Sequence, residues 1–82
     1  MGSMRGIDDD TPRRVAVLRT LKAWGPLPES DLSRMVRPFV LVTDDLRDMT
    51  EEGLVDMVFS GDEFVISPTT LGRLFLEQEE AS

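Results

Sequence analysis

Apolar side chains recur along the chain at the three- and four-residue spacing of helices, with proline or glycine between the segments. The first segment carries Val17, Leu18, Leu21 and Trp24 on one face. Thr11 is expected to be its N-cap and Pro12 its first helical residue, while Gly25-Pro26 should end it. This pattern predicts a first helix from Pro12 to Trp24.

A short second helix is expected to begin within Leu27 to Leu32. That stretch has a proline near its first turn and acids close to its start, which are both typical of a helix N-terminus. Leu32 and either Met35 or Val36 should face the core. The residue before a proline avoids helical geometry, so Arg37-Pro38 should end this helix.

The third helix is predicted from Phe39 to Glu52. Its buried stripe would consist of Phe39, Val42, Leu46 and Met49. Gly53 follows at the position where a left-handed residue commonly ends a helix. The outer face would carry Val40, Asp44, Arg47, Asp48 and Glu51. We expect these three carboxylates to face the solvent, with Arg47 pairing with Asp44 and Glu51 along the helix.

The remaining pattern predicts a β-hairpin and a last helix. Leu54 to Ser60 and Phe64 to Ser67 are rich in β-branched and aromatic residues, and the turn residues Ser60 to Glu63 connect them. Ser67 to Thr70 should open the last helix. Its inner stripe would consist of Leu71, Leu74, Phe75 and Gln78.

The amino-acid composition excludes several kinds of functional site. The 82 residues suffice for one small domain, and they include neither cysteine nor histidine. Disulfides, zinc sites of the usual kind, thiol nucleophiles and histidine acid–base catalysis are therefore excluded. We expect no catalytic residue, no metal site and no cofactor, and an enzyme is the weakest functional class.

The net charge of the chain indicates which kinds of partner it could bind. Acidic residues outnumber basic ones 16 to 9, giving a formal charge of -7. Such an excess disfavours phosphates and anionic lipid and favours a basic protein partner. The bias towards arginine and aspartate is also typical of a GC-rich genome or a salt-adapted proteome. In a salt-adapted proteome, acidity would say little against nucleic-acid binding.

The ends of the chain are expected to lie outside the fold. Met1 to Ser3 resembles an expression remnant, and residues 1–10 are predicted to be this remnant and a disordered arm, with the domain at 11–80. Asp8 to Asp10 could hold a hard cation, although a solvated tail is favoured. The sequence contains neither a membrane-span run nor a signal segment, so we expect a soluble, cytoplasmic protein with no membrane partner.

Two motifs resemble those of prokaryotic winged-helix transcription regulators. Leu46 to Val55 is similar to the family's leucine-rich third helix, which ends in Glu-Glu-Gly-Leu-Val before the wing. Thr69 to Arg73 resembles the Thr-x-x-Gly-Arg start of the helix after the wing. The resemblance covers roughly residues 11–78. It implies a mainly α fold with a small β-hairpin: a three-helix core, a two-stranded wing and a C-terminal helix.

The resemblance implies that the third helix enters the DNA major groove. Its predicted start, Pro38 to Leu41, offers no side-chain hydrogen bond for base recognition, and the wing turn brings two acids where cations usually enter the minor groove. The candidate DNA contacts are Arg13, Arg14, Arg37, Thr43 and Arg47. The favoured interpretation is a regulator that binds double-stranded DNA as a homodimer.

The alternative is an acidic winged helix that serves as a protein–protein interaction or dimerisation module without binding DNA. Several apolar residues lie off the predicted core stripes or at the start of the third helix. Those assigned to a partner or dimer interface are Phe39, Val40, Leu41 and Leu76. Exposed apolar side chains grouped in this way are typical of interaction surfaces, and extra core packing is the other explanation.

Overall fold

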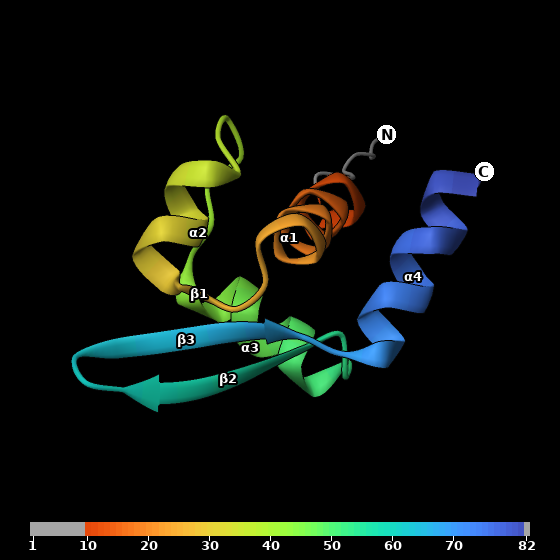
Figure 1. The fold of residues 1–82 in the computed structure, drawn as a ribbon. Coiled ribbons are helices and arrows are strands. Elements are labelled where there is room, and N and C mark those ends of the chain that lie inside the picture. The colour runs from red at the N-terminus through yellow and green to blue at the C-terminus, as the bar shows by residue number, and fades with distance from the viewer. Residues whose placement is uncertain (1–9, 82) are drawn as a thin grey trace.

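The computed structural model describes residues 10–81, which form four helices and a three-stranded antiparallel sheet. In chain order the elements are α1 (Asp10–Trp24), β1 (Leu27–Pro28), α2 (Glu29–Met35), α3 (Thr43–Glu51), β2 (Val55–Ser60), β3 (Glu63–Pro68) and α4 (Thr70–Ala81). Figure 1 shows α1 between α2 and α4, with the sheet and α3 below. Residues 1–9 of the predicted arm, with Asp8 and Asp9, lie outside the described residues, whereas Asp10 is the first residue of α1.

The sheet has the order β1-β3-β2, so β3 is its central strand. The predicted hairpin is confirmed: β2 and β3 pair from Val55 opposite Pro68 to Ser60 opposite Glu63. Gly61 takes a φ of 67° in the two-residue turn, as tight hairpin turns require. The sequence did not predict β1, a two-residue strand whose Leu27 lies opposite Ile66.

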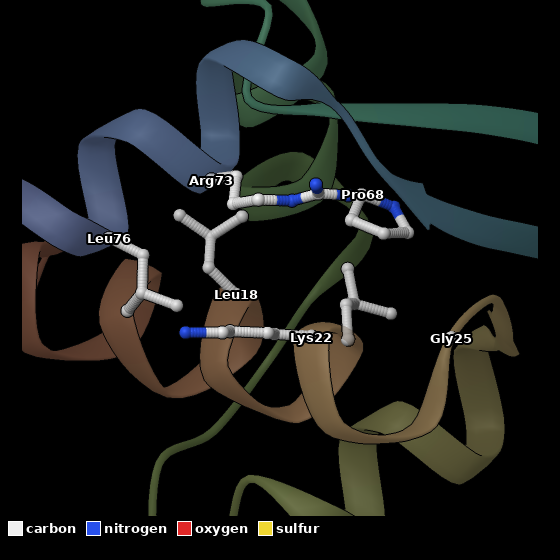
Figure 2. Close-up of a pocket in the computed structure, with 7 residues that line it drawn as sticks. Leu18, Lys22, Gly25, Pro68, Arg73 and Leu76 are labelled. Carbon is white, nitrogen blue, oxygen red and sulfur yellow. The ribbon is translucent and has the colours of Figure 1, made fainter.

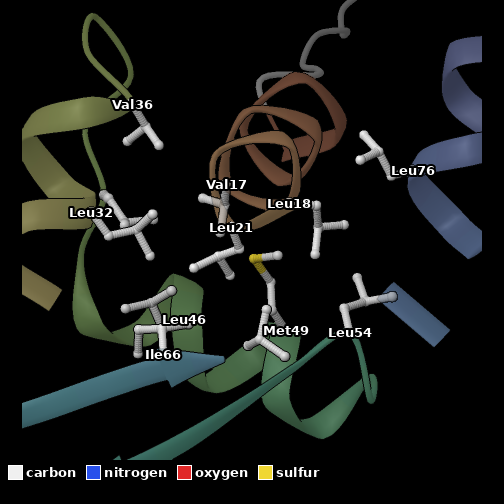
Figure 3. Close-up of a cluster of buried hydrophobic side chains, with 12 residues drawn as sticks. Val17, Leu18, Leu21, Leu32, Val36, Leu46, Met49, Leu54, Ile66 and Leu76 are labelled. Atoms are coloured by element: carbon white, nitrogen blue, oxygen red, sulfur yellow. The ribbon is translucent and has the colours of Figure 1, made fainter. Parts of the chain in front are cut away.

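The core joins all four helices to the sheet (Figure 3). Its buried side chains are Val17, Leu18, Leu21, Leu32, Val36, Leu41, Leu46, Met49, Leu54, Val55, Ile66 and Leu76. Most of the predicted α1 stripe is therefore confirmed, but Trp24 is 68% exposed because α1 ends there and no element covers its side chain. Val36, rather than Met35, faces the core from the end of α2.

The predicted start of α1 is wrong by a few residues. The helix begins at Asp10, so Thr11 is helical and is not the N-cap. At the other end Gly25 takes a φ of 83°, and its N–H donates to the carbonyl of Leu21 over 2.7 Å. The predicted stop at Gly25 is thus confirmed.

The third helix is shorter than predicted, because α3 begins at Thr43 and residues 39–42 are not helical. A carboxylate sets this start: Asp45 Oδ2 accepts a 3.1 Å hydrogen bond from the N–H of Val42, whose backbone is extended. Val42 is consequently exposed and Phe39 half-buried, and Leu41 enters the core instead. Leu46 and Met49 are buried as predicted.

The end of α3 agrees with the sequence. Gly53 has a φ of 81°. The N–H of Leu54 donates to the Met49 carbonyl over 2.9 Å, and the N–H of Gly53 donates to the Thr50 carbonyl over 3.0 Å. This pair of bonds is the Schellman arrangement that a left-handed residue permits at a helix end.

Most of the predicted inner face of α4 is wrong, although Phe75 is partly buried and packs against the core. Leu71 and Leu74 are 52% and 53% exposed, Gln78 is exposed, and Leu76 is buried. Gly72 explains this rotation, because a Cβ there would lie 2.1 Å from the carbonyl oxygen of Leu54. The helix therefore approaches the Leu54 backbone through its glycine, and Leu76, one turn later, points into the core.

Candidate nucleic-acid interface

The segment 36–42 connects α2 to α3 and forms one wall of an open hollow, here called the α2–α3 hollow. Its lining residues are Ser33, Arg34, Arg37, Pro38, Phe39, Val40 and Leu41. The structure thus brings the predicted DNA contact Arg37 together with three predicted interface residues. Val40 is 72% exposed, whereas Leu41 is buried and unavailable to a partner.

The two arginines at the start of α1 are bound to carboxylates of the α3 segment. Arg14 Nε and Nη2 donate to the two oxygens of Glu52 over 2.9 and 2.8 Å, a bidentate pair. Arg13 Nη1 lies 3.5 Å from Asp45 Oδ1. These side chains connect α1 to both ends of α3, so contact with a phosphate would compete with their existing ion pairs.

Thr43, another predicted DNA contact, lies at the start of α3. Its hydroxyl donates to Glu29 Oε2 over 2.8 Å and connects the first residues of α2 and α3. A second carboxylate also contacts the start of α2, since Glu63 Oε1 accepts a 3.1 Å hydrogen bond from the N–H of Ser30. Sequence reasoning missed both roles, because each pair joins residues that are distant along the chain.

The outer face of α3 is acidic, as predicted. Asp44, Asp48 and Glu51 are all exposed. Arg47 Nη1 lies 3.7 Å from Asp44 Oδ1, which confirms that predicted pair, and Arg47 forms no second ion pair with Glu51. Both partners of the Asp44 pair are mostly solvated, so its stabilising effect is small.

Three exposed arginines lie on α2, on α3 or between them: Arg34, Arg37 and Arg47. Arg34 forms an ion pair with Asp31 on its own helix and was not predicted from the sequence. The available signal was its position in the last turn of α2, next to the segment that turns into α3. Arg37 has no acidic partner among the described residues.

Comparison with known proteins supports a class of fold. No protein-family model matches the chain, and no curated protein matches it. Among solved structures, a probable transcriptional regulator from Pseudomonas aeruginosa is similar, with a TM-score of 0.70 and 25% sequence identity. The match covers 85% of this chain and 56% of that one. The fold is regulator-like.

This regulator-like fold exposes several large apolar side chains on α4 and β2. Leu71 and Leu74 lie on the outer face of α4, and Val58 and Phe59 are exposed on β2. Phe59 packs edge-on against Phe64, with 5.2 Å between the ring centroids. The predicted interface residue Leu76 is buried, so the exposed apolar surface of α4 belongs to other leucines.

Metal sites and membrane spans are both absent from residues 10–81. No group of three or more carboxylates there could hold a metal ion. No helix in that range is both long enough and apolar enough to cross a membrane.

Proposed function

We propose that this chain is the winged-helix domain of a transcription regulator and that it binds double-stranded DNA. The observation that carries the proposal is the succession of α2, a turn, α3 and a hairpin, in a fold similar to that of a probable transcriptional regulator. In this assignment α3 is the helix that approaches the major groove, and the β2–β3 hairpin is the wing.

The exposed arginines Arg34, Arg37 and Arg47 make the phosphate contacts in this proposal. Arginine forks suit phosphate oxygens, and such contacts fix the position of a protein on DNA without reading its sequence. The acidic face of α3 limits direct base contacts, although Val40 could touch a thymine methyl group. Sequence preference would therefore depend mainly on DNA shape.

The proposed DNA-binding species is a homodimer. Leu71 and Leu74 lie three residues apart on α4, and both are about half exposed, as expected for a face that packs against a second copy. A twofold dimer would place two α3 helices one turn of DNA apart. Replacing both leucines with glutamate should give a monomer in sedimentation equilibrium, whereas Val58→Glu on the hairpin should leave the dimer intact.

A second candidate function rests on charge. The net charge is -7, Asp44, Asp48 and Glu51 are all exposed on α3, and the apolar Val40 is exposed in the segment before that helix. Exposed carboxylates together with an exposed apolar side chain suit a basic protein partner. In this alternative the domain would act in regulation without touching DNA.

Salt-dependent DNA binding separates the two functions. Fluorescence polarisation with labelled random genomic fragments should show binding that weakens as KCl rises from low to molar concentration. Arg37→Gln and Arg47→Gln should each lower the slope of log affinity against log salt by about 1. Arg19→Gln is the matched control, because Arg19 is exposed but pairs with Glu80 on the α4 side. Absence of binding at every salt concentration would eliminate the DNA-binding proposal and favour the protein partner.

A further inference from the structure

The two edges of the sheet differ in how open they are. The β1 edge has two residues, and one of them, Pro28, has no N–H to donate to a further strand. The β2 edge has six residues and contains no proline. Its last three residues, 58–60, are exposed, and Figure 1 shows the β2–β3 turn reaching beyond α2. An edge of this kind can pair with a further strand.

The register of the hairpin identifies the backbone groups that face this open edge. In an antiparallel pair, opposite residues alternate between pairs that exchange two hydrogen bonds and pairs that exchange none. Val55 lies opposite Pro68, which has no N–H, so this pair exchanges none. The N–H and C=O groups of Met57 and Phe59 therefore face away from β3, and no described residue bonds to them. Val55 is buried, so the accessible edge begins at Met57.

The two faces of the sheet differ in polarity along this edge. The side chains of Met57 and Phe59 lie on the face that packs on the core, where Phe59 meets the ring of Phe64. Phe59 is nevertheless 62% exposed. Asp56 and Val58 lie on the opposite face, and both are exposed. A strand added to this edge would meet apolar side chains on one face and a carboxylate on the other.

The hairpin carries acidic side chains and no cation. Residues 54–72 include neither lysine nor arginine, and their acids are Asp56, Asp62 and Glu63. Asp56 and Asp62 form no ion pair within residues 10–81. Arg73 is the next cation along the chain. Figure 2 shows it extending towards Pro68, beside the cavity between α1 and α4, and it forms no ion pair with Asp56. The charge of the hairpin therefore favours a basic partner.

We propose that the open edge of β2 binds an extended, basic segment of a partner protein as an additional antiparallel strand. Met57 and Phe59 would each exchange two backbone hydrogen bonds with an apolar residue of the partner. The side chains of these partner residues would pack beside Met57 and Phe59. The partner residue opposite Asp56 would be arginine or lysine, so the segment would alternate basic and apolar residues.

A second copy of this chain matches the edge less well. Pairing two β2 edges would bring the carboxylates of both hairpins together without a cation. The strand site is also separate from the α2–α3 hollow and from the acidic face of α3. Strand addition does not depend on DNA binding, because no residue of β2 is assigned to a DNA contact.

The test uses a capped peptide, Arg-Val-Thr-Val-Arg, titrated into the isotope-labelled full chain and followed by NMR. The peptide should bind at a single site, and amide hydrogen exchange at Met57 and Phe59 should slow because their N–H groups gain acceptors. Exchange at Val58 should change little, because its N–H already faces β3.

Two peptide controls separate strand pairing from charge attraction. Methylating both valine nitrogens, whose N–H groups would face β2, should weaken binding about tenfold through the lost hydrogen bonds. Methylating the threonine nitrogen, whose N–H would face the solvent, should leave the affinity unchanged. Replacing both arginines with glutamate should also weaken binding about tenfold, because like charges would then face each other.

Variants of the chain test the same contacts from the other side. Asp56→Asn should weaken peptide binding about threefold, as expected for one exposed ion pair. Glu77→Gln is the matched control, because Glu77 is exposed on α4. Phe59→Pro removes an edge N–H that Phe59→Ala keeps, so the proline variant should bind the peptide more weakly than the alanine variant.

Three results would overturn the proposal: no peptide binding at millimolar concentration, equal affinity for the two methylated peptides, or unchanged exchange at Met57 and Phe59 on saturation. Measuring exchange without peptide tests another occupant. If exchange at these two residues slows as the protein concentration rises, a second copy occupies the edge and the basic-partner proposal fails. Loss of DNA binding with intact peptide binding would overturn only the proposed function.

Discussion

The two connections that flank α3 are built differently. After α3, the chain at Gly53 and Leu54 is fixed by the Schellman bonds and by contacts from the start of α4. Before α3, residues 36–42 make hydrogen bonds of another kind: the N–H of Phe39 donates to the Val36 carbonyl over 3.0 Å, the N–H of Val42 donates to the Asp45 side chain over 3.1 Å, and the Ser33 hydroxyl donates to the Leu41 carbonyl over a long 3.4 Å. Backbone-to-backbone contact leaves little freedom in the first connection. The second connection leaves Arg37 and Val40 exposed to solvent.

Adding a methyl group at Gly72 should produce the largest effect. The Cβ of Gly72→Ala would lie 2.1 Å from the carbonyl oxygen of Leu54, so α4 or β2 must move. Because this contact is with the backbone, no side-chain rotation can relieve it, and we expect a loss of about 3 kcal/mol or more in the free energy of unfolding. Urea denaturation, monitored by circular dichroism, measures this loss of unfolding free energy.

Gly61→Ala is the matched control for that substitution. Gly61 has a φ of 67°, but no atom lies within 4 Å of the position that a methyl group would take, so alanine there adds backbone strain without a clash. We expect a cost of about 1 kcal/mol. Equal costs at the two glycines would show that close approach of α4 to Leu54 does not fix the junction.

Removing the Thr69 hydroxyl should have the next largest effect. This oxygen accepts a 2.9 Å hydrogen bond from the N–H of Gly72 and lies 2.6 and 2.9 Å from the carbonyl oxygens of Gly53 and Leu54. It therefore caps α4 and connects that helix to the end of α3. Thr69→Val keeps the shape and should cost about 2 kcal/mol in unfolding free energy.

Thr70→Val is the control, since Thr70 is exposed and no hydrogen bond involves its hydroxyl in the described residues. Its unfolding free energy should change by less than about 0.5 kcal/mol. If the two threonine variants were equally stable, the Thr69 contacts would not contribute to the junction.

These contacts also show which parts of the fold the sequence could predict. The hairpin, the end of α3 and most of the α1 stripe depend on local patterns, and the structure agrees with them. The face of α4 could not be predicted, because Leu71 and Leu74 give a good amphipathic pattern that the contact between Gly72 and Leu54 overrides.

The candidate site was predictable only in part, for a similar reason. Exposure of Asp44, Asp48 and Glu51 follows from helical spacing alone. Arg13 and Arg14 form ion pairs with carboxylates that lie 32 and 38 residues away along the chain, and no local sequence pattern reveals such pairs.

The smallest effect is expected in the connection before α3, at Asp45. Asp45→Ala removes the acceptor of the Val42 N–H and the 3.5 Å ion pair with Arg13. Loss of such a helix-start contact costs about 1 kcal/mol in unfolding free energy. Asp44→Ala, the control, removes an exposed neighbour and should cost less than about 0.5 kcal/mol in unfolding free energy.

Amide hydrogen exchange at Val42 should quicken in Asp45→Ala alone, because that N–H loses its acceptor. Suppose that Asp45→Ala lost as much unfolding free energy as Thr69→Val. The side-chain contacts before α3 would then constrain the chain as strongly as the contacts after it, and the proposed difference between the two connections would be wrong.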